Sequence, residues 1–134
     1  MKQLKQRLQN GFTLIEVLIV VVILGILVSI AVPTYLSYVK KGYASDAKVT
    51  IKAIMNAATV FENETGLWPT DVEALEEDGH LELEEAVKTK WQFEISETEI
   101  VATSLEGMKG GAGERVVFYI EEGLYRGYGQ SEEE

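Results

Sequence analysis

The first third of the chain is an almost unbroken apolar run from Phe12 to Val39, which contains one charged residue, Glu16. A helix needs about 20 apolar residues to cross a bilayer, so this run is long enough to span a membrane. A carboxylate inside lipid costs about 2.5–3.5 kcal/mol and is therefore rare without a function. The pattern predicts a membrane-spanning helix whose one acidic side chain needs a partner.

After this run the pattern becomes that of an amphipathic helix, with apolar residues at steps of three and four. The helix should end near Thr65, because Gly66 can terminate it and Pro69 cannot continue it. Counted from Phe12, it has about 54 residues and a length of roughly 80 Å. No domain of this size needs so long a helix, so its first half can bury its surface only in lipid or against copies of itself. The predicted stripe comprises Leu36, Val39, Tyr43, Ala47, Ile51, Ile54, Ala58 and Phe61, and Lys40, Lys41, Lys48 and Lys52 lie off it.

The C-terminal half has the two-residue alternation of half-buried strands. Trp91, Phe93 and Ile95 alternate with polar residues, and residues 100–105 have the composition of a hairpin partner. Two further strands are expected over residues 115–120 and 124–128. About four antiparallel strands would then pack their apolar face on the stripe between Ala47 and Phe61. The expected fold class is α+β.

Two connecting segments carry local signals. Thr70 and Glu73 have the spacing of a capping box, which predicts a short helix from Asp71 to about Glu77 that Gly79 stops. The glycine-rich segment 107–113 lacks the Gly-Lys-Ser/Thr ending of a phosphate-binding loop, and we interpret it as a flexible connection between strands.

Composition narrows the possible functions. The 134 residues allow one modest domain plus a long helix, and the chain has no cysteine, which excludes a disulfide or a thiolate metal site. Twelve basic and twenty-two acidic residues give a net charge of −10. Direct binding to nucleic acid is not predicted, because phosphate contacts need clustered Lys and Arg.

Few residues suggest catalysis. His80 is the one histidine, and we interpret it as a surface-loop residue. Acidic pairs such as Glu84-Glu85 could in principle hold calcium, which prefers several oxygen ligands. We predict no catalytic residue, no metal site and no cofactor, so the chain is not expected to be an enzyme.

The residues before the apolar run are basic. Lys2, Lys5 and Arg7 precede Gly11 without any acid, which by the positive-inside rule keeps this end in the cytoplasm. A secretory signal peptide is a poor match, because its apolar core is shorter and precedes its cleavage site. A plain single-span anchor gives no reason for Glu16. A monomeric single-span protein with an extracytoplasmic binding domain remains an alternative.

The order of these features resembles a type IV prepilin, the precursor of type IV pilins and of the pseudopilins of type II secretion. The resemblance covers roughly the first third of the chain. It implies cleavage by a prepilin peptidase between Gly11 and Phe12, methylation of the new Phe12 amine, and a contact between Glu16 and the Phe12 amine of a neighbouring subunit. The matching residues are Lys5, Arg7, Gly11, Phe12, Thr13, Leu14, Ile15, Glu16 and Pro33.

The resemblance also implies a division of the chain and a conformational change. The helix would unwind between Gly25 and Pro33 in an assembled filament, where glycine and proline weaken it. The expected pilin fold places a long helical spine against a small sheet. The expected parts are a leader over residues 1–11, a hydrophobic half-helix over 12–36, an amphipathic half over 37–65, a globular αβ-loop and sheet region over 66–130, and an acidic tail over 131–134.

The sequence therefore predicts a structural subunit, most simply the major pilin of a bacterial type IV pilus. It would wait as a single-pass protein in the cytoplasmic membrane until assembly machinery draws it into a homopolymer at the cell surface. Alternatives are a major pseudopilin of type II secretion and a minor pilin. The aspartate-based calcium site common in major pseudopilins finds no matching aspartates near the C-terminus, which favours the pilin.

Overall fold

The computed structural model describes residues 11–131. The leader predicted over residues 1–11 therefore lies outside the described residues except for Gly11, and the tail predicted over residues 131–134 does so except for Ser131. By its internal contacts the chain divides into two units, Met1–Leu36 and Ser37–Glu134.

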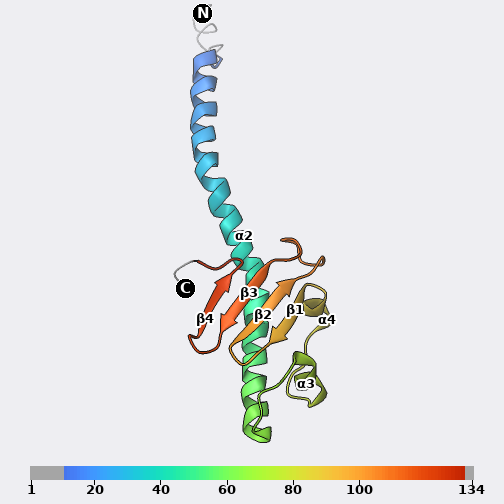
Figure 1. Ribbon diagram of the computed structural model, residues 1–134. Helices are drawn as coiled ribbons and strands as arrows, with labels where there is room; N and C mark the ends of the chain where they lie inside the picture. The colour runs from blue at the N-terminus through green and yellow to red at the C-terminus, as the bar shows by residue number, and fades with distance from the viewer. Residues whose placement is uncertain (1–10, 132–134) are drawn as a thin grey trace, which may run out of the picture. The chain divides into compact units, whose positions relative to one another are not determined.

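The long helix α2 covers Leu14–Thr65 and confirms the predicted helix, with a start two residues later (Figure 1). It continues through Gly25 and Pro33 without interruption. Within its apolar part the mean hydropathy reaches 3.1 and none of that surface is buried. In length and composition, α2 is the one helix of the described part that could cross a membrane.

The second unit contains a four-stranded antiparallel sheet, in the order β1-β2-β3-β4. The strands are β1 (Trp91–Ile95), β2 (Glu99–Ser104), β3 (Arg115–Tyr119) and β4 (Leu124–Gly127), each within one residue of the predicted bounds. Their register aligns Phe93, Ala102, Val116 and Gly127 in one row across the sheet. The predicted α+β class and strand number are confirmed.

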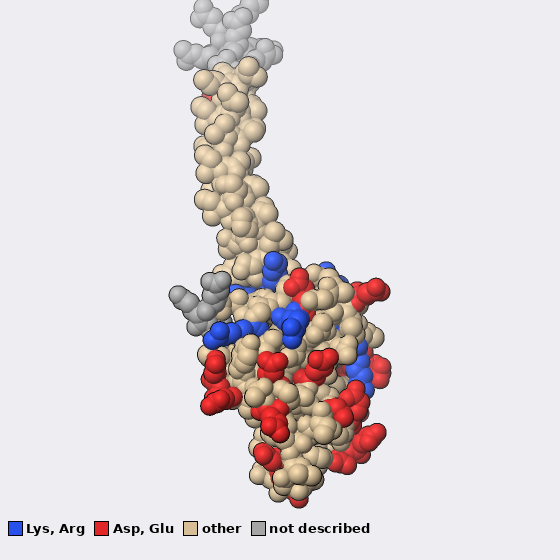
Figure 2. All heavy atoms as spheres, in the orientation of Figure 1, with Lys and Arg blue, Asp and Glu red and all other residues tan. Residues whose placement is uncertain are grey.

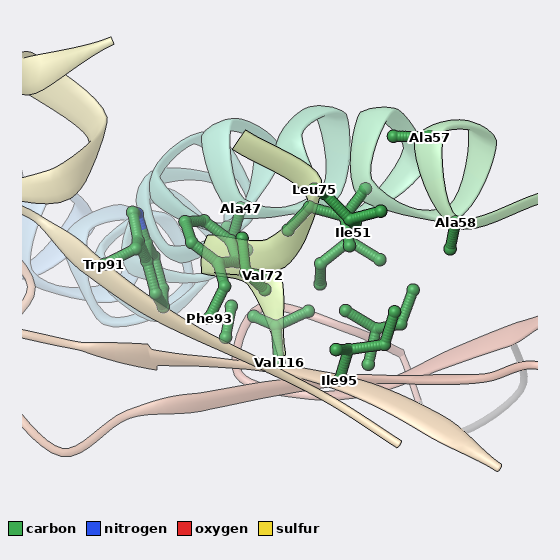
Figure 3. Close-up of a cluster of buried hydrophobic side chains, with 14 of the residues drawn as sticks. Ala47, Ile51, Ala57, Ala58, Val72, Leu75, Trp91, Phe93, Ile95 and Val116 are labelled. Atoms are coloured by element: carbon green, nitrogen blue, oxygen red, sulfur yellow. The ribbon is translucent and has the colours of Figure 1, made fainter. Parts of the chain in front are cut away.

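The core of this unit lies between the sheet and one face of α2 (Figure 3). Ile51 and Ile54 are fully buried against Ile100 and Val116 of the sheet. Alanines bring the helix close to the strands because their side chains occupy little space. Leu36, the first residue of the predicted stripe, is 53% exposed, and the buried face begins further along the helix. The buried residues of α2 are Ala44, Ala47, Thr50, Ile51, Ile54, Ala57 and Ala58.

The helix α3 (Val72–Glu77) begins differently from the prediction. Its N-cap is Asp71, whose carboxylate accepts the Ala74 N–H at 2.8 Å, while the Thr70 hydroxyl donates to that same carboxylate. The predicted capping box between Thr70 and Glu73 is therefore wrong. Aspartate is as good an N-cap as serine or threonine, and it stands one residue closer to the helix.

The stretch after α3 contains the short helix α4 (Glu85–Lys88). Lys88 pairs with Glu76 at 2.9 Å, which joins α4 to α3. This hydrogen bond to the carboxylate raises the pKa of Lys88.

His80 lies in a loop, as predicted, but two contacts hold it there. His80 follows α3, but its Nε2 lies 3.1 Å from the Glu64 carboxylate and its ring meets the edge of Phe61. Its side chain is only 19% exposed. Both contacts come from the end of α2, and the neighbouring glycine gave no indication of them.

The glycine-rich connection between β2 and β3 is also more ordered than predicted. The Ser104 hydroxyl donates to the Gly111 carbonyl at 2.6 Å and accepts the Glu114 N–H at 2.8 Å. Met108 is buried, and a Cβ on Gly107 would lie 2.4 Å from the Thr89 carbonyl oxygen. Gly107 permits this close packing, and the contacts of the segment contradict its interpretation as a flexible connection.

Candidate assembly site

The predicted site residues at the start of α2 lie next to one another. Gly11 and Phe12 precede the helix in irregular, exposed backbone. The peptide bond that joins them is therefore outside the helical hydrogen-bond ladder. Phe12 is 90% exposed, and it lines a shallow hollow together with Glu16, Val17 and Val20.

Glu16 forms a capping box with Thr13. The Thr13 N–H donates to Glu16 Oε2 at 2.8 Å, and the Glu16 N–H donates to Thr13 Oγ1 at 3.3 Å. The two side chains thereby satisfy two amide groups that have no partner inside the helix. The negative charge is also favourable at a helix N-terminus, because the helix dipole is positive there.

Our sequence reasoning missed this role of Thr13. The signal was present, because Thr13 and Glu16 have the same Thr-x-x-Glu spacing that we applied to Thr70 and Glu73. The capping box lies at the first site and not at the second. At residues 13–16 no other capping residue competes, whereas Asp71 competes with Thr70.

The Glu16 carboxylate retains binding capacity. Within the described residues its Oε1 atom accepts no hydrogen bond, although a carboxylate can accept several. It is also the one charged side chain from residue 11 to residue 39, so the surface around it in Figure 2 is almost entirely uncharged. An isolated carboxylate with a free oxygen on an apolar surface is suited to bind a cation that arrives with further apolar surface.

Gly25 and Pro33 lie further along α2. A Cβ on Gly25 would meet nothing within 4 Å, so packing within this unit does not require glycine there. Between them, Ser29 Oγ donates to the Ile26 carbonyl at 2.6 Å, and just beyond, Thr34 Oγ1 donates to the Ile30 carbonyl at 3.0 Å. Such side-chain bonds to the backbone compete with the helical ladder and weaken it locally.

Residues 6–32 match the prokaryotic N-terminal methylation motif. This match contains Gly11, Phe12, Thr13 and Glu16. Over this N-terminal part the chain is similar to the family of type IV pilins and type II secretion pseudopilins. Within the described residues, no three His, Cys, Asp or Glu side chains gather as a metal site would require.

Curated members of both branches of the family are similar to this chain. The type II secretion system core protein G of Vibrio cholerae is 43% identical over 72 residues, which cover 54% of this chain and 49% of that protein. The core protein G of Pseudomonas aeruginosa is 40% identical over 73 residues, covering 54% and 51%. The type IV major pilin of Neisseria gonorrhoeae is 41% identical over 64 residues, covering 48% and 38%. The chain thus matches about half or less of the length of these relatives.

Proposed function

We propose that this chain is a structural subunit of a helical filament, most simply the major pilin of a type IV pilus. A prepilin peptidase cleaves it between Gly11 and Phe12 and methylates the Phe12 amine. The subunit rests in the cytoplasmic membrane until assembly machinery moves it into a filament at the cell surface. The observation that carries this proposal is the apolar half of α2, which is exposed on all sides and contains one capped carboxylate.

The exposed apolar surface of α2 must be buried in lipid or against other protein. From residue 14 to residue 36 all side chains of α2 are exposed. Burial of one large aliphatic side chain contributes about 1.5–3 kcal/mol, so this half-helix is unstable in water. Lipid covers it before assembly, and lateral packing of identical helices covers it in the filament. The exchange of one apolar surrounding for the other leaves little net hydrophobic change, so polar contacts decide which state is favoured.

Glu16 supplies such a contact. In the single subunit its Oε2 is bound to Thr13, and its Oε1 is available for the Phe12 amine of a neighbouring copy. A wrong axial offset leaves both the carboxylate and the amine buried without a partner, which is strongly unfavourable. We infer that this pair determines the stagger between adjacent helices.

The segment from Gly25 to Pro33 is helical in the single subunit and extended in the filament under this proposal. Glycine, proline and the Ser29 side-chain bond all weaken the helical ladder there. Hydrogen exchange on assembled filaments tests this. Full protection of the amides from residue 27 to residue 31 would contradict the unwinding.

A major pseudopilin of type II secretion is the second candidate. The core protein G relatives match over a larger share of their length than the gonococcal pilin does. A secretion operon around the gene or a requirement for calcium for stability would favour this candidate. Low abundance in purified filaments would instead indicate a minor pilin.

The decisive experiment is to shear filaments from the native host, image them and determine their subunits by mass spectrometry. We expect abundant filaments whose main component begins with an N-methylated Phe12. A mature protein that begins at another residue, or that stays monomeric in the membrane, would overturn the proposal.

A further inference from the structure

The second unit has an uneven distribution of charge. Residues 37–52 carry four lysines and one aspartate, which gives 4 − 1 = +3. Residues 53–87 carry ten acidic residues and neither lysine nor arginine, which gives −10. Figure 2 shows the result on one face, where Lys and Arg gather mainly toward the end of this unit at which its part of α2 begins and Asp and Glu toward the other end.

The basic end contains a groove. Lys40 and Lys41 line it from α2, and Tyr128, Gly129 and Ser131 line it from the segment after β4, around a volume of about 430 Å³. Both lysines are exposed. Glu114 also lines the groove, so the local balance is two positive charges against one negative charge.

The acidic end is formed by the last turns of α2 and the end of α3. Glu62, Glu77 and Asp78 are exposed there. The contact of His80 with Glu64 holds the two segments together. Both segments therefore contribute exposed acidic side chains to this end of the unit, Glu62 from α2 and Glu77 and Asp78 from the end of α3.

These two ends cannot neutralise each other within one copy. Lys41 and Glu62 are 21 residues apart on the same helix, which is roughly 32 Å. Exposed charges are largely screened beyond about 8 Å at physiological salt. The four ion pairs among the described residues include neither of the two lysines of the groove, nor Glu62 or Glu77.

We propose that the Lys40–Lys41 groove of one copy receives the acidic end of α2 and α3 of a second copy. This inference rests on the proposed filament. Parallel copies in this contact are offset axially by roughly 32 Å, the spacing of Lys41 and Glu62 along α2. The contact lies between globular units, so it adds to the Glu16 pair and determines which copies along the filament become neighbours.

Cross-linking tests the contact directly, because the chain has no native cysteine. The double variant Lys41→Cys/Glu62→Cys should form a ladder of covalent oligomers when sheared filaments are treated with a short thiol-reactive cross-linker. A bond within one copy is impossible at this spacing. Lys41→Cys/Glu94→Cys is the matched control. Glu94 is exposed, but it lies on β1 and outside the acidic end, so this variant should give no ladder. Filaments of the first variant without a ladder would overturn the contact.

Charge reversal decides the case if the cysteine variants do not assemble. Lys40→Glu/Lys41→Glu and Glu62→Lys/Glu77→Lys should each lower the filament yield by about tenfold or more, because like charges then meet. The chain with all four changes should recover most of the yield. Unchanged yield in either double variant, or no recovery in the combined one, would overturn the contact.

Two controls separate the alternatives. Glu132–Glu134 follow Ser131 in sequence, and because they are acidic the first control tests them as an alternative occupant of the groove. If a chain that ends at Ser131 gains a ladder that the full chain lacks, its own tail fills the groove and the contact is overturned. If the unaltered chain forms no filaments in its host, the proposed function itself has failed.

Discussion

Replacement of Glu16 tests the proposal that one carboxylate controls assembly. Glu16→Val removes the charge and the capping contact to Thr13 together. Loss of the carboxylate relieves about 2.5–3.5 kcal/mol of insertion cost. Loss of the cap costs about 0.5–2 kcal/mol. The membrane form should therefore be about 0.5–3 kcal/mol more stable than that of the unaltered chain, and cleavage should proceed.

In the filament the same change has the opposite effect. The Phe12 amine of the neighbour is left buried without a partner, which costs about 3–5 kcal/mol. Because about 1.4 kcal/mol is a factor of ten in an equilibrium constant, the subunit should favour the filament at least a hundredfold less. The protein should accumulate in the membrane in its cleaved form.

Two matched variants separate charge from capping. Glu16→Gln can keep the capping box, since Gln also caps in this position, but it has no charge to pair with an amine. Thr13→Ala keeps the charge and loses one of the two capping bonds. We expect filament yield to fall most for Glu16→Val, less for Glu16→Gln and least for Thr13→Ala.

The assay compares two quantities in the same cells, cleaved subunit in the membrane by immunoblot and subunit in sheared filaments. Normal filament yield with Glu16→Gln would show that the charge is dispensable and refute the pairing. A loss with Thr13→Ala as large as with Glu16→Val would assign the effect to the helix start instead.

Further predictions concern the globular unit, and each is measured by denaturant unfolding of the full chain in detergent. Asp71→Ala should destabilise by about 0.5–2 kcal/mol while Thr70→Ala has little effect, and the reverse order would restore the capping box that the structure rejects. Gly127→Ala should destabilise more than Gly123→Ala, because both have positive φ but only at Gly127 would a Cβ lie 2.3 Å from a carbonyl oxygen; equal losses would contradict this packing. Burial raises the pKa of Tyr125, so the folded state holds the phenol proton more tightly than the unfolded state. This contribution is complete below about pH 10 and disappears as the pH rises through the folded pKa, so Tyr125→Phe should flatten the alkaline loss of stability.

Local periodicity was sufficient to predict most of the helices and strands of this protein. The apolar run, the position of Glu16, the end of α2 near Thr65 and the four strands could all be predicted from the sequence. Each depends on neighbours within a few residues, where helix and strand geometry leave a direct trace in the spacing of apolar side chains. The proposed cleavage and assembly residues were predicted from a motif of the same local kind.

Only the tertiary structure shows which segments far apart in the chain contact one another. His80 is anchored by Glu64 and Phe61, which no local pattern around a glycine could indicate. In the glycine-rich connection, Gly111 accepts a hydrogen bond from Ser104 and the Met108 side chain is buried, neither of which the composition of the segment indicated. Sequence revealed the uneven charges, but only the fold places Lys40 and Lys41 in a groove with the segment after β4. These contacts join residues that are far apart in the chain, and their geometry exists only after the sheet has packed on α2.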